Sequence, residues 1–251
     1  AAHQYTLSIL DTIHIKIDTV TSNFNPMFEY IKNNQNQLLS IYNRNYHRIQ
    51  FYDLQNQIIT TEIQLAREGA DGIEELSAFH VHNMDSIFVF PYSGQSIYLI
   101  NKAGKVIDEY LIGAPLIVQG QVFELSMNGY SELSFNNQTS TISFAVAPYI
   151  DRETKEFYKW PMAINYNIVD HKVEKTYSNP PVSYQGNKLY YIHEELNMIN
   201  TPYYEIHHFR ASHELIIYDI STKEHVRTIY APSKYLPEQF EAILEDGDEM
   251  T

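Results

Sequence analysis

The chain contains no cysteine, which excludes disulfide bonds, thiolate metal sites and cysteine nucleophiles together. Glycine is also scarce, at 9 of 251 residues, and the sequence has neither a phosphate-binding loop nor a dinucleotide-binding fingerprint. No apolar run approaches the ~20 residues that a membrane-spanning helix needs. The nucleophile-elbow motif GxSxG and the zinc motif HExxH are missing as well. The sequence therefore carries none of the familiar signatures of nucleotide-binding, hydrolytic or membrane-spanning proteins.

Positive charge is the other shortage. Lys and Arg total 17 against 31 Asp and Glu, which leaves a formal net charge of −14. An acidic chain repels phosphate backbones and anionic lipid headgroups, so we expect no nucleic-acid partner, and membrane association only through a lipid anchor outside this sequence. The chain does have many aromatic residues, including 21 Tyr, and this composition favours sheets over helices.

A pattern of short strands recurs along the chain. A polar turn followed by an apolar strand occurs four times, at 36–41, 85–90, 140–145 and 187–192. Each copy is followed by a hairpin of two alternating strands around a polar turn, starting at Ile49, Ile97, Ile164 and Ile216. Each copy is also preceded by one more short strand, at 27–31, 78–82, 122–126 and 181–185.

Four strands in meander order, repeated about every 50 residues, are typical of the blades of a β-propeller. We therefore predict an all-β fold, a β-propeller of four-stranded antiparallel blades that forms a single domain over residues 1–251. The blades are expected at 24–66, 76–113, 120–178 and 181–232. Residues 5–17 have the character of a ring-closing strand, and residues 233–251 form a tail with an acidic end.

Several segments resemble a known family: "TLSILDTIHIKIDTVTSNFNPMFEYI", "NRNYHRIQFYDL", "HNMDSIFVF" and "IIYDI…APSKYL". They are similar to an uncharacterised bacterial family, classed as a domain of unknown function, of envelope lipoproteins with a TolB-like six-bladed β-propeller. The resemblance covers roughly residues 5–236. It implies a place in the bacterial cell envelope, in the periplasm or lipid-anchored at the outer membrane, and a chain shortened at its C-terminal end. The family offers no established catalytic residues to carry over.

Two blades show long insertions between their second and third strands, at 148–161 and 193–213, and both are expected on the same rim. The first insertion holds the only Trp, Trp160, with Tyr149, Phe157 and Tyr158 nearby. Exposed aromatic side chains can stack on sugars or hold a peptide. The alternative is that Trp160 simply fixes the loop to the propeller.

The second insertion concentrates imidazole and carboxylate groups, which transition metals select: His193, Glu194, Glu195, Glu205, His207, His208 and His213. The metal candidates among them are His193, His207 and His213. The segment "YYEIHHF" alternates like a strand, however, so His207 and His208 should point to opposite faces. An extended β-hairpin is therefore favoured over a metal site.

Two further features have mainly structural interpretations. His80 and His82 lie two residues apart on one strand, a spacing that can chelate a metal but more often serves polar packing. The inter-blade segment 66–76 brings Glu68 and Asp71 to the rim of the insertions, where a blade-linking turn is the default.

The sequence favours a non-enzymatic binding or scaffold module that presents its rim to a protein, peptide or glycan. It requires no cofactor, and whether any catalysis exists stays open. The candidate ligand-binding residues are Tyr158, Trp160, Tyr203, Tyr204, His207 and Arg210. The alternative is a metal-dependent hydrolase or lyase that uses His and Glu residues of 193–213. A third possibility is an interaction protein that pairs an exposed blade edge with a partner strand.

Overall fold

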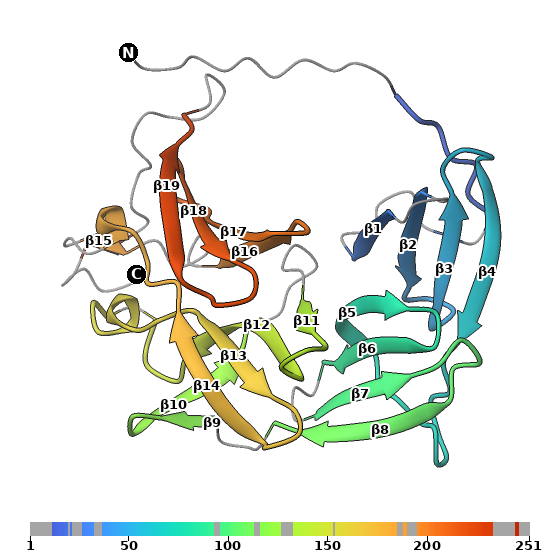
Figure 1. Ribbon diagram of the computed structural model, residues 1–251, viewed down its shortest axis with the longest axis horizontal. Coiled ribbons are helices and arrows are strands. Elements are labelled where there is room, and N and C mark those ends of the chain that lie inside the picture. The colour runs from blue at the N-terminus through green and yellow to red at the C-terminus, as the bar shows by residue number, and fades with distance from the viewer. Residues whose placement is uncertain are drawn as a thin grey trace.

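The computed structural model describes residues 12–19, 21, 27–32, 37–92, 96–112, 116–126, 133–152, 154–184, 188–189, 195–232 and 244–245. Its strands form four antiparallel blades set around a common centre (Figure 1). In the first, second and fourth blades along the chain, the first strand lies nearest the centre and the last at the periphery (Figure 1). The predicted all-β propeller is therefore confirmed. Apart from strands, the described residues contain two single-turn 3-10 helices, η1 (Phe157–Lys159) and η2 (Val182–Tyr184).

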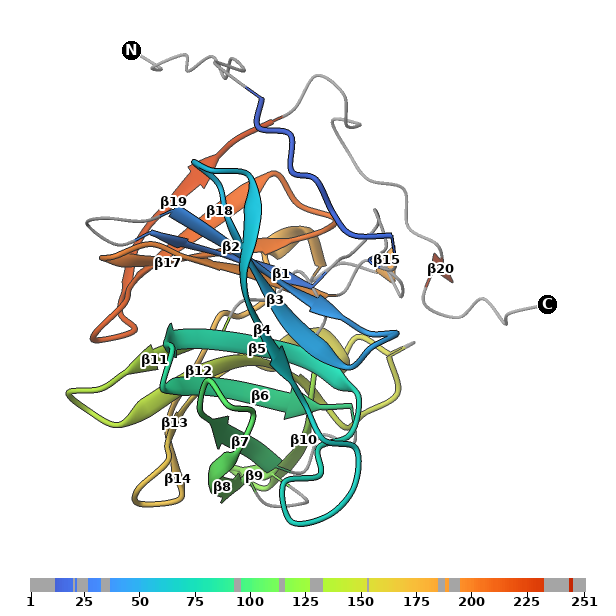
Figure 2. The ribbon, with the colours of Figure 1, turned by 90° about the vertical axis from the view of Figure 1, so that its right-hand side faces the viewer.

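The first two blades have the predicted order, each strand pairing with the next along the chain. Blade 1 comprises β1 (Phe28–Lys32), β2 (Gln37–Asn43), β3 (Arg48–Asp53) and β4 (Ile58–Gln64). Blade 2 comprises β5 (Leu76–Asn83), β6 (Ser86–Pro91), β7 (Ser96–Ile100) and β8 (Val106–Leu111). Seen from the side, β4 crosses the direction of β1 because twist accumulates across the sheet (Figure 2).

Blade 3 has a divided inner strand. Its strands are β9 (Leu116–Val118), β10 (Gln121–Leu125), β11 (Ser134–Asn136), β12 (Thr141–Pro148), β13 (Ala163–Asn167) and β14 (Lys172–Tyr177). β10 pairs with the C-terminal part of β12 and β11 with its N-terminal part, so both lie along the same edge of β12. Of the two, β11 is nearer the centre (Figure 1). β9 extends the sheet beside β10.

Blade 4 differs from the prediction. Its strands are β16 (Leu196–Asn200), β17 (Tyr204–Phe209), β18 (Glu214–Asp219) and β19 (His225–Tyr230). The hairpin predicted from Ile216 is confirmed, but the first strand predicted at 181–185 is wrong, because η2 lies there. Of the second strand predicted at 187–192, only β15 (Lys188–Leu189) is described, and it pairs with β20 (Leu244–Glu245) outside the blade.

The segment 193–213 is therefore not an insertion. From Leu196 onward it supplies the two inner strands of blade 4 and the short loop after them, so it does form a hairpin, but at a different place in the blade. At the N-terminal end, residues 12–17 form no strand, and residues 5–11 lie outside the described part of the chain. Of the predicted tail, only Leu244–Glu245 is described.

Apolar clusters fill each interface between successive blades. Blades 1 and 2 meet through a cluster that includes Ile49, Phe51, Phe79 and Val89. Blades 2 and 3 meet around Phe90, Phe123, Phe144 and Tyr166, and blades 3 and 4 around Tyr158, Tyr177, Met198 and Phe209. Because strand side chains alternate between faces, every middle blade is apolar on both sides.

Candidate functional site

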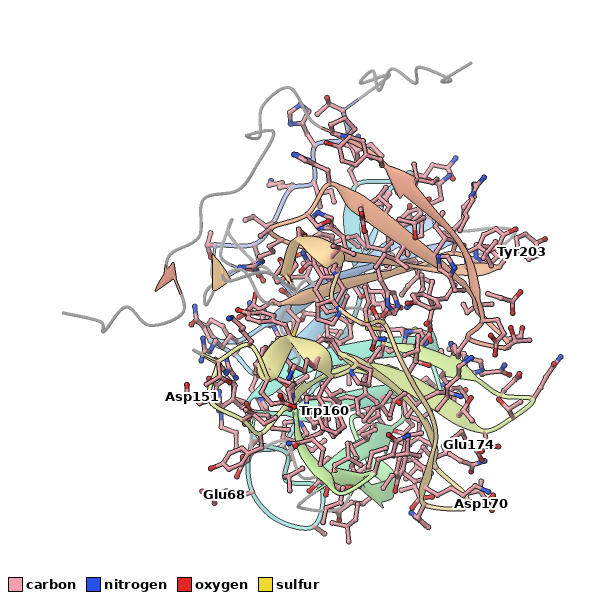
Figure 3. The ribbon with its side chains drawn as sticks, turned by 90° about the vertical axis from the view of Figure 1, so that its left-hand side faces the viewer. Glu68, Asp151, Trp160, Asp170, Glu174 and Tyr203 are labelled. Carbon is pink, nitrogen blue, oxygen red and sulfur yellow. The ribbon has the colours of Figure 1, made fainter. Side chains whose placement is uncertain are left out.

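One face of the propeller carries the loops that join the second strand of each blade to the third. We call this face the loop rim; its described segments are residues 44–47, Tyr92, 149–152, 154–162 and 210–213. These loops share a face because the second strands of all four blades run in the same sense. Figure 3 shows Asp151 and Trp160, from the loop of blade 3, on one side of the molecule, and Tyr203, from the β16–β17 turn, on the opposite side.

The loops of the first three blades each project a tyrosine into solvent. The exposed fractions are 48% for Tyr46, 78% for Tyr92 and 72% for Tyr149. The corresponding loop of blade 4 holds Arg210 instead, whose guanidinium lies 2.7 Å from the carboxylate of Glu195. Sequence reasoning missed this recurrence, although the signal was available as one Tyr within three residues after each of the three second strands.

The insertion of blade 3 turns most of its aromatic side chains inward. Phe157 and Tyr158 are buried between blades 3 and 4, and the Tyr158 ring lies 5.5 Å from that of Tyr184. Trp160 meets the ring of Phe123 edge-on at 6.0 Å. Trp160 thus fixes the loop to the propeller, and Tyr158 cannot form part of an exposed aromatic surface.

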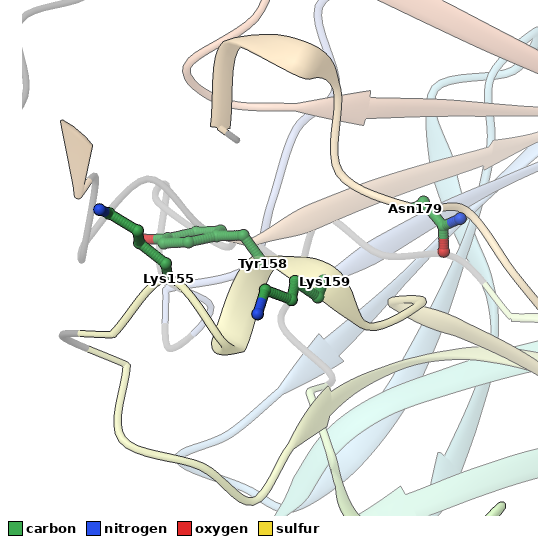
Figure 4. Close-up of a pocket in the computed structure, with 4 residues that line it drawn as sticks. All are labelled: Lys155, Tyr158, Lys159 and Asn179. Atoms are coloured by element: carbon green, nitrogen blue, oxygen red, sulfur yellow. The ribbon is translucent and has the colours of Figure 1, made fainter. Parts of the chain in front are cut away.

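Polar contacts hold the same insertion in place. Arg152 pairs with Glu124 on β10 at 2.8 Å, and the backbone carbonyl of Asp151 accepts hydrogen bonds from the amide and hydroxyl of Thr154. Beside η1 lies a cavity of about 350 Å³, and the described residues that line it are Lys155, Tyr158, Lys159 and Asn179 (Figure 4). Asn179 belongs to the segment that leads from β14 to η2, so the cavity joins the insertion to the blade 3–blade 4 connection.

The predicted site residues of blade 4 are separated by the sheet. Tyr203 and Tyr204 are exposed and lie at the β16–β17 turn, away from the loop rim, whereas Arg210 lies on it. His207 is fully buried, so it cannot contact a surface ligand. His208 points to the other face, as the alternation predicted, and its Nε2 lies 3.0 Å from the carbonyl oxygen of Ser212.

A buried polar cluster joins blades 3 and 4. Glu205 on β17 accepts hydrogen bonds from the Ser134 hydroxyl and from the Tyr177 hydroxyl, the latter at 2.6 Å. The Lys223 ammonium, from the β18–β19 turn, lies 2.5 Å from the same carboxylate. His207 Nε2 is 3.5 Å from Glu205. We call these five residues the inter-blade cluster.

The cluster keeps its carboxylate ionised. Burial by itself raises the pKa of Glu205, but the neighbouring His207 ring and the Lys223 ammonium outweigh burial and lower the pKa to about 2. Burial, with the adjacent Glu205 charge, raises the pKa of Tyr177 well above its usual range, so Tyr177 stays a hydrogen-bond donor. The arrangement is that of a structural ion pair.

Metal binding finds no support in the described part of the chain, where no group of three or more His, Asp or Glu could hold an ion. His193 and Glu194 lie outside the described residues. His80 Nδ1 lies 2.9 Å from Glu29 on β1, which links the inner strands of blades 1 and 2. Asp71 contacts Lys105 Nζ at 2.7 Å and accepts a hydrogen bond from the Val106 amide, as a blade-linking turn would.

The chain belongs to the family described as Domain of unknown function (DUF4221), which matches residues 4–239. A crystal structure of a member of this family from Bacteroides vulgatus is similar at a TM-score of 0.67 and 19% sequence identity. The match covers 90% of this chain and 63% of that one, so the present chain spans less than two thirds of the longer protein. At this identity the likeness shows the fold alone.

Two more distant structures are similar in part. One is a candidate exported protein from Bacteroides fragilis, with 11% identity, 84% of this chain and 52% of that chain covered, and a TM-score of 0.48. The other is Sqt1 from Saccharomyces cerevisiae, with 8% identity, 82% and 49% covered, and a TM-score of 0.44. Scores this low carry no argument about this chain. No curated protein matches it.

Proposed function

We propose that this member of the DUF4221 family is a non-enzymatic binding module that presents its loop rim to a protein partner. The observation that carries the proposal is the exposed tyrosine in the loop of three successive blades, Tyr46, Tyr92 and Tyr149. Tyrosine supplies a large, amphipathic contact area at little cost in side-chain entropy, and it is enriched among the residues that dominate interface energetics. Tyrosines spread over three blades suit a partner as wide as a protein better than a single sugar ring.

We further propose that the complete propeller has six blades. Exposed apolar side chains support this, because they lie on the two sheets that border the interval between blade 4 and blade 1 in Figure 1. On blade 1, Phe28 and Tyr30 are exposed on β1, and on blade 4, Ile199 is exposed beside Ile206 on β17. Four blades account for 63% of the related crystal structure, which leaves room there for about two more of the same size.

A place in the bacterial envelope, with a lipid anchor and a TolB-like propeller, completes the proposal. It rests on the resemblance of the segments quoted above to envelope lipoproteins. Among the described residues, no helix is long and apolar enough to cross a membrane. Labelling the full-length protein with a fatty-acid analogue in its own bacterium tests the anchor, because an unlabelled protein in the soluble fraction would contradict it.

Site-specific photo-crosslinking tests the binding function while the partner is still unidentified. A photoreactive phenylalanine analogue replaces Tyr92 or Tyr149 on the loop rim, or Tyr203 as a control of similar exposure (73%) on the opposite face. In cells of the source bacterium we expect one adduct of defined mass from positions 92 and 149 and none from position 203. The proposal fails if the loop-rim positions give no adduct, or if all three positions give the same adducts.

Alanine substitutions then measure the contribution of each tyrosine. Once the partner is known, Tyr92→Ala and Tyr149→Ala should each weaken binding about tenfold or more, as anchors at interfaces do. Tyr203→Ala should leave the affinity unchanged. The melting temperature of each variant, which we expect to match that of the parent because the side chains are exposed, separates lost binding from lost folding.

A further inference from the structure

The sheet of blade 3 ends in an additional strand, which the four-stranded sheets of the other blades lack. β9 pairs with β10 on one side, and no described strand pairs with its other side. In Figure 1 it lies at the lower margin of the molecule. An open strand edge is the feature of a sheet that an extended polypeptide segment can join through main-chain hydrogen bonds.

The register shows which backbone groups point off this edge. The amide of Tyr149, the residue after β12, donates to the Val122 carbonyl oxygen at 2.8 Å, so the backbone polar groups of Val122 point toward β12. Val122 is opposite Ile117 in the pairing of β10 with β9. Because Val122 turns its groups away from β9, this is a non-hydrogen-bonded pair, and the N–H and C=O of Ile117 point away from β10. Ile117 therefore presents one donor and one acceptor at the edge.

The side chains beside this edge are apolar and exposed. Ile117 lies opposite Val122, and Val122 lies opposite Tyr149, so these three side chains form one row on one face of the sheet. Ile117, at the edge, is 58% exposed, and Tyr149, at the other end of the row, is one of the exposed tyrosines of the loop rim. The row thus connects the edge of β9 to the loop rim.

The absence of charge distinguishes β9 from the outer edges of the blades. The outermost strands β4, β8, β14 and β19 carry Glu62, Asp108 and Glu109, Lys172, Glu174 and Lys175, and Arg227. Such charges protect a strand edge from pairing with another chain. From Leu111 to Phe123 no residue is charged, although charged residues make up 19% of the chain. An uncharged edge suits an uncharged segment, because a charged segment would lose hydration there without gaining an ion pair.

We propose that the edge of β9 receives an extended, uncharged segment of the partner polypeptide, which adds to blade 3 as a further strand. The Ile117 amide donates a hydrogen bond to a carbonyl oxygen of that segment, and the Ile117 carbonyl oxygen accepts one from an amide. Every second side chain of the segment lies on the face of the apolar row, where it contacts Ile117. The inference rests on the proposed function and deepens it by stating how the loop rim holds part of its protein partner.

Selection from a phage-displayed library of random nine-residue peptides, with the whole chain as the target, tests the inference while the partner is unidentified. We expect the selected peptides to lack charge and to carry β-branched or aromatic residues at every second position. Methylation of single backbone amides in a synthetic copy then tests for strand addition. Methylation of an amide that faces β9 should weaken binding about fivefold, whereas methylation of the amides on either side of it should have little effect.

Variants of Ile117 locate the contact on the protein. Ile117→Pro removes the amide hydrogen that points off the edge, and an edge strand tolerates proline where the missing donor faces solvent. We expect this variant to keep the melting temperature of the parent and to lower the affinity of a selected peptide about tenfold. The matched control is Ile117→Val, which keeps both the amide and a branched side chain and should bind as the parent does. If Ile117→Pro is less stable, the methylated peptides give the decisive result with the parent chain.

Several results overturn the inference: no peptide is selected, methylation weakens binding without this alternation, or Ile117→Pro folds and binds as Ile117→Val does. Self-association of the chain that Ile117→Pro abolishes also overturns it, because the occupant of the edge is then a second copy. Failure here is distinguishable from failure of the proposed function, since Tyr92 lies on another blade. If Tyr92 still crosslinks to a partner in cells, the loop rim remains a binding surface without strand addition at β9.

Discussion

Replacing Lys223 by methionine removes the positive charge from the inter-blade cluster and leaves the rest in place. Methionine is close to lysine in length, and it inherits the same left-handed backbone at this turn, where φ is 56°. The Glu205 carboxylate, which is fully buried, keeps its hydrogen bonds from Ser134 and Tyr177 but loses its cation. The substitution therefore isolates the cost of an uncompensated buried charge.

Breaking a buried ion pair by removing one partner typically costs about 3–5 kcal/mol, because the remaining charge stays desolvated. For a domain of this size, such a loss lowers the melting temperature by on the order of 10 °C. Denaturant titration followed by far-UV circular dichroism measures the free energy of unfolding. Trp160, the only tryptophan, gives a second probe at the blade 2–blade 3 interface.

Two variants serve as controls for this result. Lys172→Met removes an exposed lysine that pairs with Asp170 and Glu174, and should change the free energy of unfolding by no more than about 1 kcal/mol. Adding Glu205→Gln to Lys223→Met removes the unpaired carboxylate charge, and should restore about 2 kcal/mol of the free energy of unfolding that Lys223→Met loses. If Lys223→Met is as stable as Lys172→Met, the cluster is not the stabilising ion pair described above.

The pH dependence gives an independent check with a defined sign. The pKa of Glu205 is lowered from 4.5 to about 2, so the folded state binds this proton less readily than the unfolded state. This shift contributes on the order of 3 kcal/mol to the free energy of unfolding; the contribution is present above about pH 4.5 and is lost as the pH falls toward 2. In Lys223→Met the carboxyl is easier to protonate, so the stability difference between parent and variant should shrink on acidification from pH 7 to pH 4. A difference that grows would refute the argument.

Two further predictions concern single residues of the scaffold. A Cβ at Gly104, where φ is +72°, would overlap the backbone carbonyl oxygen of Gln64, so Gly104→Ala should destabilise the protein by about 3 kcal/mol or more. Gly69→Ala, with φ of +88° and no atom within 4 Å of the added Cβ, should cost about 1 kcal/mol in the same denaturant titration, and equal losses would contradict the steric explanation. Burial lowers the pKa of His47, whose Nε2 lies 2.8 Å from the Ile73 carbonyl oxygen. The contribution of the neutral ring to the free energy of unfolding is therefore complete above about pH 6.5 and is lost as the pH falls below that value. His47→Gln should flatten the stability profile between pH 7 and 5, and an unchanged profile would exclude His47 as its source.

The repeat is a reliable guide wherever a blade keeps its standard loops. Strands β1 to β8 fall where the alternation and the polar turns predict them, because both signals are local properties of the chain. In blade 4 the pattern near 187–192 resembles a second strand, which makes the alternation at 196–209 look like part of an insertion. More apolar strand-like segments precede β18 than the two inner strand positions of blade 4 can hold, and the pairing of β17 with β18 determines which segments occupy them.

The candidate site depends on the direction in which side chains point, and the local sequence predicts this direction less well than it predicts strand positions. Tyr158, Trp160 and His207 are residue types that binding sites use. In the fold, however, Tyr158 and His207 are buried against the adjacent blade, and Trp160 packs against Phe123. Tyr92 and Tyr149 belong to no distinctive motif, but both are more than two-thirds exposed in the fold. Exposure is a property of the packed blades rather than of the residue.

The sequence by itself determined the all-β composition, the four-stranded period, the acidic charge and the exclusion of cysteine chemistry, because each depends only on residue identity and spacing. Only the tertiary structure decided which strands make blade 4 and which tyrosines face solvent. It also brought Ser134, Tyr177, Glu205 and Lys223 together across up to 89 positions of the chain. Such contacts are set by the stacking of one blade on the next, and that stacking follows from burial of apolar faces that many alternative pairings could also satisfy.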